Sequence, residues 1–508
     1  MAKKKGFQGD APVRDAFGQL GTGRTLLLGL QHMFAMFGAT ILVPLLTGLS
    51  VQVTLIGVGI GTLIFHFFAK GRVPVFLGSS FAFLVGIRLI TDPGSGIFPV
   101  HTARLLDSAG NYLIDAAGNF EYGVYIQQGM NGLAAGTIVT NLEYRNATLA
   151  YATGGILAAG FVYFALALVI KLVGVKKVMK AMPPVVTGPI VILIGVMLAP
   201  FAISQSSNNM PLALISLGIV VVAAVWGKGM AKVVPLVLGM LGGYAVALIM
   251  NAVGMSNPDG SAIFQFAQVA EASIVGMPPF MLPRFNIVAI MIMIPFAFAT
   301  IAEHIADMVI LSDLCEEDFT KKPGLHRTLV GDGLATCFSG FIGAPATTTY
   351  SENVGVVVLT KIQDAKVVML AAVYATILGF LPIFAQIVYT IPEAIVGGVS
   401  FILYGMIAAV GIRSLVENQV DIGKTKNLII VAVILVTGLG LRFGPAITVT
   451  LGNTDLPIDR LGVAIAAILG ILLNFILPNE KEDKTVVVGL ETGGTIALEE
   501  EEENPQSD

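Results

Sequence analysis

The chain of 508 residues is 55% hydrophobic and only 12% charged, with a mean hydropathy of +0.84 and a formal net charge of −4. Soluble proteins carry about 25% charged residues, so this composition excludes an ordinary soluble protein. Apolar stretches of about 20 residues, the length that crosses a bilayer, recur from Arg24 to Pro478. The predicted fold class is therefore an all-α polytopic membrane protein.

The apolar stretches fall into two sets of seven. The first set is predicted at 24–47, 51–69, 73–90, 150–172, 183–203, 210–227 and 232–254. The second set is predicted at 285–311, 327–343, 346–361, 365–389, 393–412, 427–441 and 460–477. Two sets of seven predict an internal repeat.

The distribution of basic residues predicts the orientation. If both termini are cytoplasmic, all but six of the 29 lysines and arginines lie on the cytoplasmic side; the six are Arg88, Arg104, Arg145, Arg284, Arg442 and Arg460. This bias agrees with the positive-inside rule for a multi-pass protein of the cell membrane. Because seven is odd, residues 24–254 and 285–478 would form inverted repeats joined by an extracellular connection at 255–284, an arrangement that predicts alternating access.

The ends and one insertion lie outside these repeats. Residues 1–23 are basic but have no small-residue cleavage site, so we interpret them as a cytoplasmic leader. Residues 479–508 form an acidic cytoplasmic tail. Residues 91–149 form a polar extracellular insertion, whose Asn-Ala-Thr sequon at 146–148 is too weak a signal to indicate glycosylation. Cys315 and Cys337 have neither metal-ligand nor redox-motif spacing.

The third span of each set is short and interrupted. The first contains Val-Pro-Val-Phe-Leu-Gly-Ser-Ser-Phe-Ala at 73–82, and the second contains Ala-Pro-Ala-Thr-Thr-Thr-Tyr-Ser-Glu-Asn-Val-Gly at 344–355. Matched broken segments indicate a binding site at the membrane midplane, because half-helix N-termini offer unpaired N–H groups to a ligand. The alternative interpretation is a pair of kinked packing helices.

Acidic residues from three predicted helices point to the same chemistry. Glu303 and Asp307 share one helix face, Asp332 lies in the next span, and Glu352 begins the second broken segment beside Asn353. Ionisable residues within a membrane span are costly and are functional candidates. Glu303 and Asp307 could instead lie at a hydrated cytoplasmic end, Glu352 could be only a helix cap, and Asp332 is a structural or proton-relay candidate.

These groups constrain the ligand. Carboxylates would repel an inorganic anion, whereas a planar imide such as uracil or xanthine offers N–H donors to them and C=O acceptors to the half-helix N–H groups. Phe81 and Tyr350 lie beside the two breaks and could stack on a ring, or could simply pack. Buried carboxylates can take up protons near neutral pH, so Glu303, Asp307 and Glu352 are candidates for proton coupling. His304 and Asn353 are interpreted as structural residues near the site, and His32 as a packing residue.

From about Leu26 to Pro478 the chain resembles the nucleobase-ascorbate transporter family, and within it the bacterial uracil permeases. The resemblance lies in Gln-His-Met-Phe-Ala-Met-Phe-Gly-Ala-Thr at 31–40, Leu-Gly-Ser-Ser-Phe-Ala-Phe at 77–83, Ala-Glu-His-Ile at 302–305, Pro-Gly-Leu-His-Arg at 323–327 and Thr-Thr-Tyr-Ser-Glu-Asn-Val-Gly at 348–355.

The resemblance implies 14 spans, a core domain and a gate domain, a homodimer, and an elevator-type movement. It also implies that Glu303 and Glu352 bind the pyrimidine N–H groups, and that main-chain amides near Ser80, Phe81 and Ser351 bind its carbonyl groups. Ala39 and Tyr404 correspond to positions that line or adjoin the pocket. Glu at position 352 resembles the uracil branch, since purine carriers typically have Gln there.

Two departures keep alternatives open. Asp307 resembles purine carriers, because uracil permeases commonly have His at that position, and the insertion at 91–149 exceeds the usual connection. The leading prediction is import of uracil with protons, without a metal, another cofactor or a nucleic-acid partner. Xanthine or another purine is the alternative within the family, and an anion exchanger or channel is the alternative from another class. An enzyme is not expected, since the sequence lacks a Ser and His, paired Asp or metal-ligand pattern.

Overall fold

The computed structural model describes residues 12–92, 100–104, 122–126, 138–139, 141–175, 177, 183–258, 260–264, 266–445, 447–451 and 454–478. Most of the predicted leader at 1–23, much of the insertion at 91–149 and the predicted acidic tail at 479–508 lie outside the described residues.

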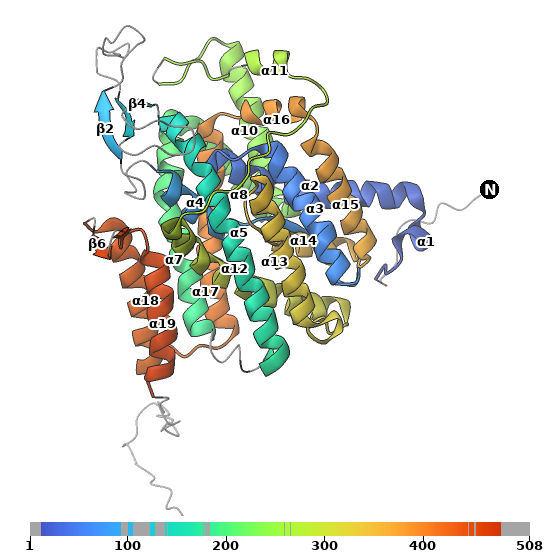
Figure 1. The fold of residues 1–508 in the computed structure, drawn as a ribbon. Helices are drawn as coiled ribbons and strands as arrows, with labels where there is room; N and C mark the ends of the chain where they lie inside the picture. Colours follow the sequence, from blue (N-terminus) through green and yellow to red (C-terminus); the bar gives the residue numbers. More distant parts are fainter. Residues whose placement is uncertain are drawn as a thin grey trace, which may run out of the picture.

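Long apolar helices dominate the fold (Figure 1). Within the described residues, eight helical stretches are long and apolar enough to cross a membrane, or nine when one bent pair is counted as a span. They are α2 (Thr22–Thr47), α3 (Val51–Phe68), α5 (Asn141–Val173), the stretch Pro184–Trp226, α10 (Pro235–Ala252), α12 (Ile287–Cys315), α17 (Glu393–Glu417) and α18 (Thr425–Phe443).

Several predicted spans are divided in the structure. The stretch Pro184–Trp226 comprises α7 (Pro184–Ser206), η2 (Ser207–Asn209) and α8 (Met210–Trp226). The bent pair, α15 (Ala365–Gly379) and α16 (Pro382–Tyr389), turns by 84°. Pro382 begins α16, where a proline without an N–H group can start a helix but cannot continue the preceding one.

The remaining predicted spans are shorter or less apolar helices. They are α4 (Ala82–Thr91), α13 (Leu325–Ile342), α14 (Ser351–Thr360) and α19 (Gly462–Ile476). Every predicted span therefore overlaps at least one helix, but α4 and α14 have only ten residues each.

Each of these ten-residue helices follows a short strand, β1 (Leu77–Ser79) or β5 (Thr347–Thr349). The two strands pair antiparallel, with Leu77 opposite Thr349 and Ser79 opposite Thr347. Non-helical backbone inside a membrane protein must satisfy its polar groups internally. This pairing does so, and it brings the two sequence breaks together.

The helices form two groups that lie on different sides of the molecule in Figure 1. On one side, α3 packs against α13 and α15, and α13 packs against α5. On the other side, α7 packs along α17, and both α18 and α19 contact α7. A Cβ atom at Gly411 would lie 2.5 Å from the carbonyl oxygen of Gly188, so glycine allows α7 and α17 this close approach.

Smaller elements lie at the ends of the helices. They are α1 (Ala16–Leu20), β2 (Val100–Arg104), β3 (Tyr122–Ile126), β4 (Ile138–Val139), α9 (Met230–Val233), α11 (Ala267–Glu271), η3 (Thr320–Gly324), β6 (Thr448–Leu451) and β7 (Thr454–Pro457). The insertion thus contributes a three-stranded sheet in the order β2-β3-β4, whereas its sequence predicted only a polar extracellular segment.

Candidate substrate-binding site

The two half-helices begin beside the β1–β5 pair. Phe81 precedes α4 and Tyr350 precedes α14, and neither side chain caps the backbone N–H groups of the helix that follows. The backbone N–H of Ser80 is already used, because it donates to the carbonyl oxygen of Ala346 at 2.8 Å. The free N–H groups for a ligand therefore belong to the first turns of the two helices.

A cavity of about 950 Å³ opens beside these helix starts. Phe81, Thr348 and Tyr350 line it from the two broken segments, Ala39 lines it from α2, and Glu303 lines it from α12. The opposite wall comes mainly from α7, α10 and α17, and the cavity extends as far as Lys232, Glu417 and Asn418. The structure therefore brings four of the candidate site residues, Ala39, Phe81, Glu303 and Tyr350, to one cavity.

The acidic residues of α12 occupy different environments. Glu303 is half-buried at the cavity wall. Asp307 is only 2% exposed, and the hydroxyl group of Thr349 donates to its carboxylate oxygen Oδ2 at 2.6 Å. The interpretation of Asp307 as a residue at a hydrated helix end is wrong in this structure, since the side chain is buried against β5.

Asp332 lies behind the cavity rather than in its lining. Its Oδ2 atom is 3.1 Å from Nδ1 of His304, and both side chains are fully buried. The hydroxyl groups of Tyr163 in α5 and Thr300 in α12 are also buried and lie 2.5 Å apart. A buried carboxylate requires such a partner, so His304 and Asp332 join α12 to α13.

His32 and Asn353 form a second buried polar contact. Nδ1 of His32 is hydrogen-bonded to the side-chain oxygen of Asn353, and both residues are fully buried. This contact joins α2 to α14 directly after position 352. Asn353 thus lies near the site without lining the cavity.

The tyrosines have different placements. Tyr350 is 3% exposed, and its hydroxyl group donates to the carbonyl oxygen of Ser79 at 2.8 Å. Its ring lies against Gly78, because a Cβ atom there would be 2.1 Å from the ring. Tyr404 is buried on α17 and is absent from the cavity lining. Tyr350 therefore fastens β5 to β1, whatever contact it makes with a ligand.

Ser351 and Glu352 lie in the first turn of α14, where their backbone places them at the site, and their side chains lie outside the described residues. Two hydroxyl groups at the broken segments have a property that the sequence did not predict. Those of Ser80 and Thr348 are buried and have no hydrogen-bond partner in the described part of the chain. The three consecutive threonines at 347–349 were the available signal for Thr348 and Thr349.

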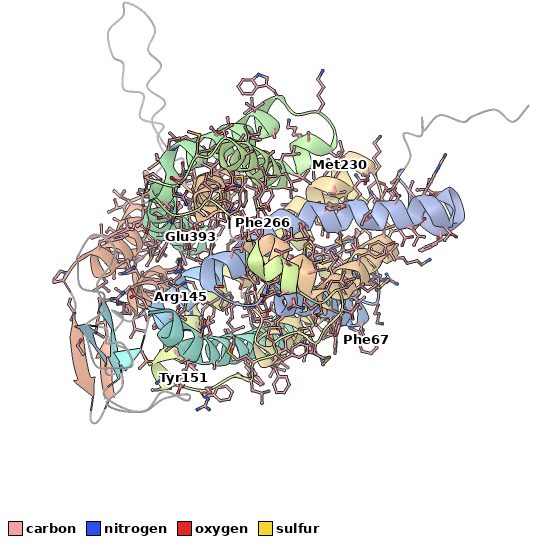
Figure 2. The ribbon with its side chains drawn as sticks, turned by 90° about the horizontal axis from the view of Figure 1, so that it is seen from above. Phe67, Arg145, Tyr151, Met230, Phe266 and Glu393 are labelled. Carbon is pink, nitrogen blue, oxygen red and sulfur yellow. The ribbon has the colours of Figure 1, made fainter. Side chains whose placement is uncertain are left out.

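The C-terminal parts of α4 and α7 share a charged contact. The guanidinium of Arg88 lies 5.2 Å from the ring centre of Phe201, a cation–π contact between α4 and α7. Arg460 lies 3.8 Å from Asp92, which follows α4. Figure 2 labels Arg145 and Glu393, which both interact electrostatically with Arg88. None of these residues lines the cavity, and the contact between Arg88 and Phe201 joins α4 to α7.

Comparison with known proteins decides the family. A family model described as "Permease family" matches residues 23–97 and 114–447. The chain belongs to this permease family. It is the nucleobase-ascorbate transporter family whose motifs the sequence resembles, and its members are transport proteins rather than enzymes.

Curated relatives cover nearly the whole permease. A uracil permease of Bacillus subtilis (strain 168) is 35% identical over 505 residues, covering 95% of this chain and 98% of the relative. A uracil permease of Bacillus caldolyticus is 34% identical over 489 residues, covering 93% and 96%. A putative pyrimidine permease, RutG, of Escherichia coli (strain K12) is 35% identical, covering 91% of each chain.

Solved structures show the same fold at low sequence identity. The transmembrane domain of a cyanobacterium bicarbonate transporter, BicA, has a TM-score of 0.55 at 15% identity, covering 92% of this permease and 100% of that chain. A structure of SLC26A9 has a TM-score of 0.53 at 14% identity, covering 88% and 64%. These likenesses concern the fold alone.

Proposed function

We propose that this permease imports uracil together with protons across the cell membrane. The observation that carries the proposal is the cavity in which Glu303 faces the starts of two half-helices. Carboxylates accept hydrogen bonds from the ring N–H groups of an imide, and helix N–H groups donate to its carbonyl groups. Relatives named uracil permeases, about 35% identical over nearly the full chain, support the same substrate.

The same chemistry separates this permease from proteins of similar fold that carry anions. Glu303 places a carboxylate at the cavity wall, and Glu352 is the second residue of α14. Two carboxylates would repel an anion, whereas a neutral imide can satisfy them together with the N–H groups at the starts of the two half-helices. An anion exchanger or channel remains the alternative from another class, and it predicts that Glu303→Gln and Glu352→Gln increase chloride or bicarbonate flux.

Proton coupling is assigned to Glu303 and Asp307, with Glu352 and Asp332 as further candidates. Glu303 meets the cavity, and Asp307 lies one helical turn away, bonded to Thr349 of β5. A proton taken up by either carboxylate would alter the hydrogen bonds at the substrate site. Asp307 is also the observation that favours a second candidate substrate, xanthine or another purine, because Asp at this position resembles purine carriers.

The proposed transport cycle uses the two helix groups as a core and a gate. In this scheme 14 spans form two inverted repeats with both termini cytoplasmic, and the core carries the β1–β5 site past α7, α10 and α17 in an elevator-type movement. The protein would work as a homodimer. The cavity reaches Lys232 and Glu417, which the proposed orientation places on the cytoplasmic side.

The binding site is tested by calorimetry of uracil with purified Glu303→Gln and Glu352→Gln variants. Each change replaces an acceptor with an amide that can present an N–H donor to a ligand donor, so we expect uracil affinity to fall at least a hundredfold. Glu417→Gln is the matched control, since Glu417 lines the far end of the same cavity. Unchanged uracil affinity in both site variants would overturn the assignment.

A further inference from the structure

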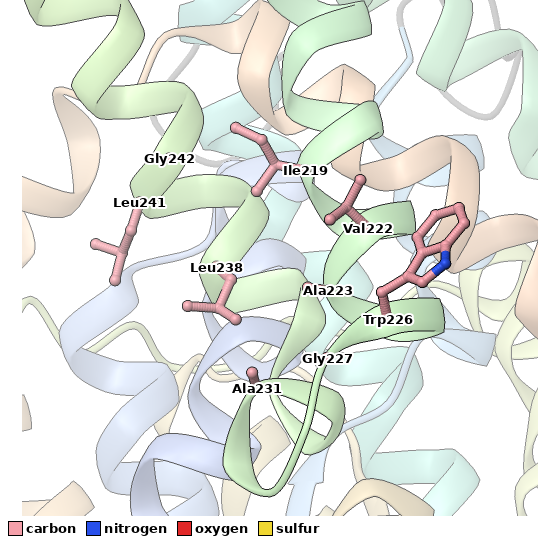
Figure 3. Close-up of a pocket in the computed structure, with 9 residues that line it drawn as sticks. All are labelled: Ile219, Val222, Ala223, Trp226, Gly227, Ala231, Leu238, Leu241 and Gly242. Atoms are coloured by element: carbon pink, nitrogen blue, oxygen red, sulfur yellow. The ribbon is translucent and has the colours of Figure 1, made fainter.

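A second, apolar hollow lies on the outer face of the helix bundle, apart from the transport cavity (Figure 3). It has a volume of about 490 Å³ and lies between α8, α9 and α10. Its lining contains no charged side chain; the residues are Ile219, Val222, Ala223, Trp226, Gly227, Ala231, Leu238, Leu241 and Gly242. We call it the α8–α10 groove.

The groove is open to the surroundings rather than enclosed. Val222, Trp226 and Leu241 are 56%, 69% and 62% exposed. Figure 3 shows the ring of Trp226 at one side of the groove and Leu241 at the other. In a membrane protein such a surface faces acyl chains, and tryptophan is characteristic of the level where the acyl chains meet the headgroups.

The end of the groove beside Trp226 carries positive charge. The connection 227–234 contains Lys228 and Lys232 and no acidic residue. Both lysines are exposed, and neither forms an ion pair with any carboxylate in the described part of the chain. In the proposed orientation this connection is cytoplasmic, where the membrane surface holds anionic lipids.

We propose that the α8–α10 groove binds one anionic phospholipid, with an acyl chain in the groove and the headgroup phosphate at Lys228. Charge complementarity selects this occupant, because a lysine near the membrane surface attracts an anionic headgroup. A zwitterionic lipid would fill the groove without this preference.

The site is joined to the transport machinery through α9. Ala231 lines the groove, whereas Lys232 and Val233, the next two residues, line the transport cavity. α9 also contacts α14, and the side-chain amide of Gln31 in α2 donates to the sulfur of Met230. A lipid bound in the groove would therefore stabilise α9, which forms part of the wall of the transport cavity.

The test uses Trp226, the only tryptophan of the chain, as the reporter. The purified protein is reconstituted in phosphatidylcholine bilayers, and brominated phosphatidylglycerol or brominated phosphatidylcholine is added at increasing mole fraction to quench its fluorescence. We expect phosphatidylglycerol to quench at a roughly fivefold lower mole fraction, and Lys228→Gln to remove this difference. Lys424→Gln, at the start of α18, is the matched control and should keep it.

A groove-filling variant distinguishes occupation of the groove from attraction to the surface. The Cβ atom of residue 242 would lie 2.7 Å from Cδ1 of Ile219, the flexible end of a side chain, so Gly242→Leu can be accommodated and should reduce quenching by both lipids. Equal quenching by the two lipids in the unaltered protein would overturn the proposal. Weak quenching by both, together with self-association, would instead assign the groove to a second copy.

Discussion

The hydroxyl group of Thr349 donates a 2.6 Å hydrogen bond to the buried carboxylate of Asp307. Thr349 is the last residue of β5, and Asp307 lies one turn beyond Glu303 on α12. The bond therefore ties the crossing of the two broken segments to the helix that carries the cavity carboxylate. A substitution at either residue should therefore change the affinity for the substrate.

Thr349→Val removes this donor while keeping the shape of the side chain. A hydrogen bond to a charged group contributes about 1.5–3 kcal/mol, so the variant should unfold at lower temperature and bind uracil more weakly. Thr349→Ser retains the hydroxyl group and should stay close to the unaltered protein. Thermal unfolding in detergent and uracil titration measure both effects; equal losses in the two variants would show that the hydroxyl group has no such role.

Gly78→Ala should disrupt the strand crossing. The added Cβ atom would lie 2.1 Å from the Tyr350 ring, and overpacking of this kind costs about 1–3 kcal/mol or more. We expect loss of uracil binding and a lower unfolding temperature, partly restored when Tyr350→Ala is added. Gly218→Ala is the control, since nothing lies within 4 Å of its Cβ position. If Tyr350→Ala restores neither uracil binding nor the unfolding temperature, the clash is not with this ring.

The His304 and Asp332 pair should show strong energetic coupling. Removing one partner leaves the other buried without compensation, so His304→Leu or Asp332→Leu should each destabilise the protein by about 3–5 kcal/mol. The double variant should lose much less than the sum of the two. A double-mutant cycle on denaturant unfolding measures the coupling, and additive losses would contradict the pairing.

The contacts at the C-terminal ends of α4 and α7 should favour the conformation described here. Asp92→Arg places two cations together and should weaken this contact. The reporter is a cysteine at Leu403, on the cavity wall, in a chain with Cys315 and Cys337 replaced by alanine. This cysteine should react faster with an impermeant maleimide added outside. We expect a few-fold change, because Asp92 is half exposed. Adding Arg460→Asp should restore the slower reaction with maleimide. If the reaction stays fast in the double variant, the effect of Asp92→Arg does not come from its contact with Arg460.

The helical segments were predictable because their signal is local. Apolar stretches of membrane-crossing length mark α2, α12 and α17 within the chain itself, and the interruptions at 73–82 and 344–355 mark the two strands. The convergence of Glu303 with both breaks also followed from the sequence, since half-helix starts and a buried carboxylate belong to one kind of site.

The partners of the site residues were not predictable, because they depend on contacts between distant segments. The pairing of Leu77 with Thr349 sets the register of β1 and β5 across some 270 residues, and no local pattern fixes it. The same register places the Tyr350 ring against Gly78 and brings Thr349 to Asp307. From the sequence, Tyr350 was only a candidate for stacking on a ligand, and Asp307 was an acidic residue with no predicted partner.

The most direct test of the account is uptake of radiolabelled uracil into proteoliposomes, with and without an inward proton gradient, in competition with xanthine, uric acid and thymine. The account predicts uptake that the gradient stimulates and that pyrimidines alone inhibit. Uptake that xanthine blocks, or that ignores the gradient, would contradict proton-coupled uracil transport and assign the cavity to a purine or to an uncoupled carrier.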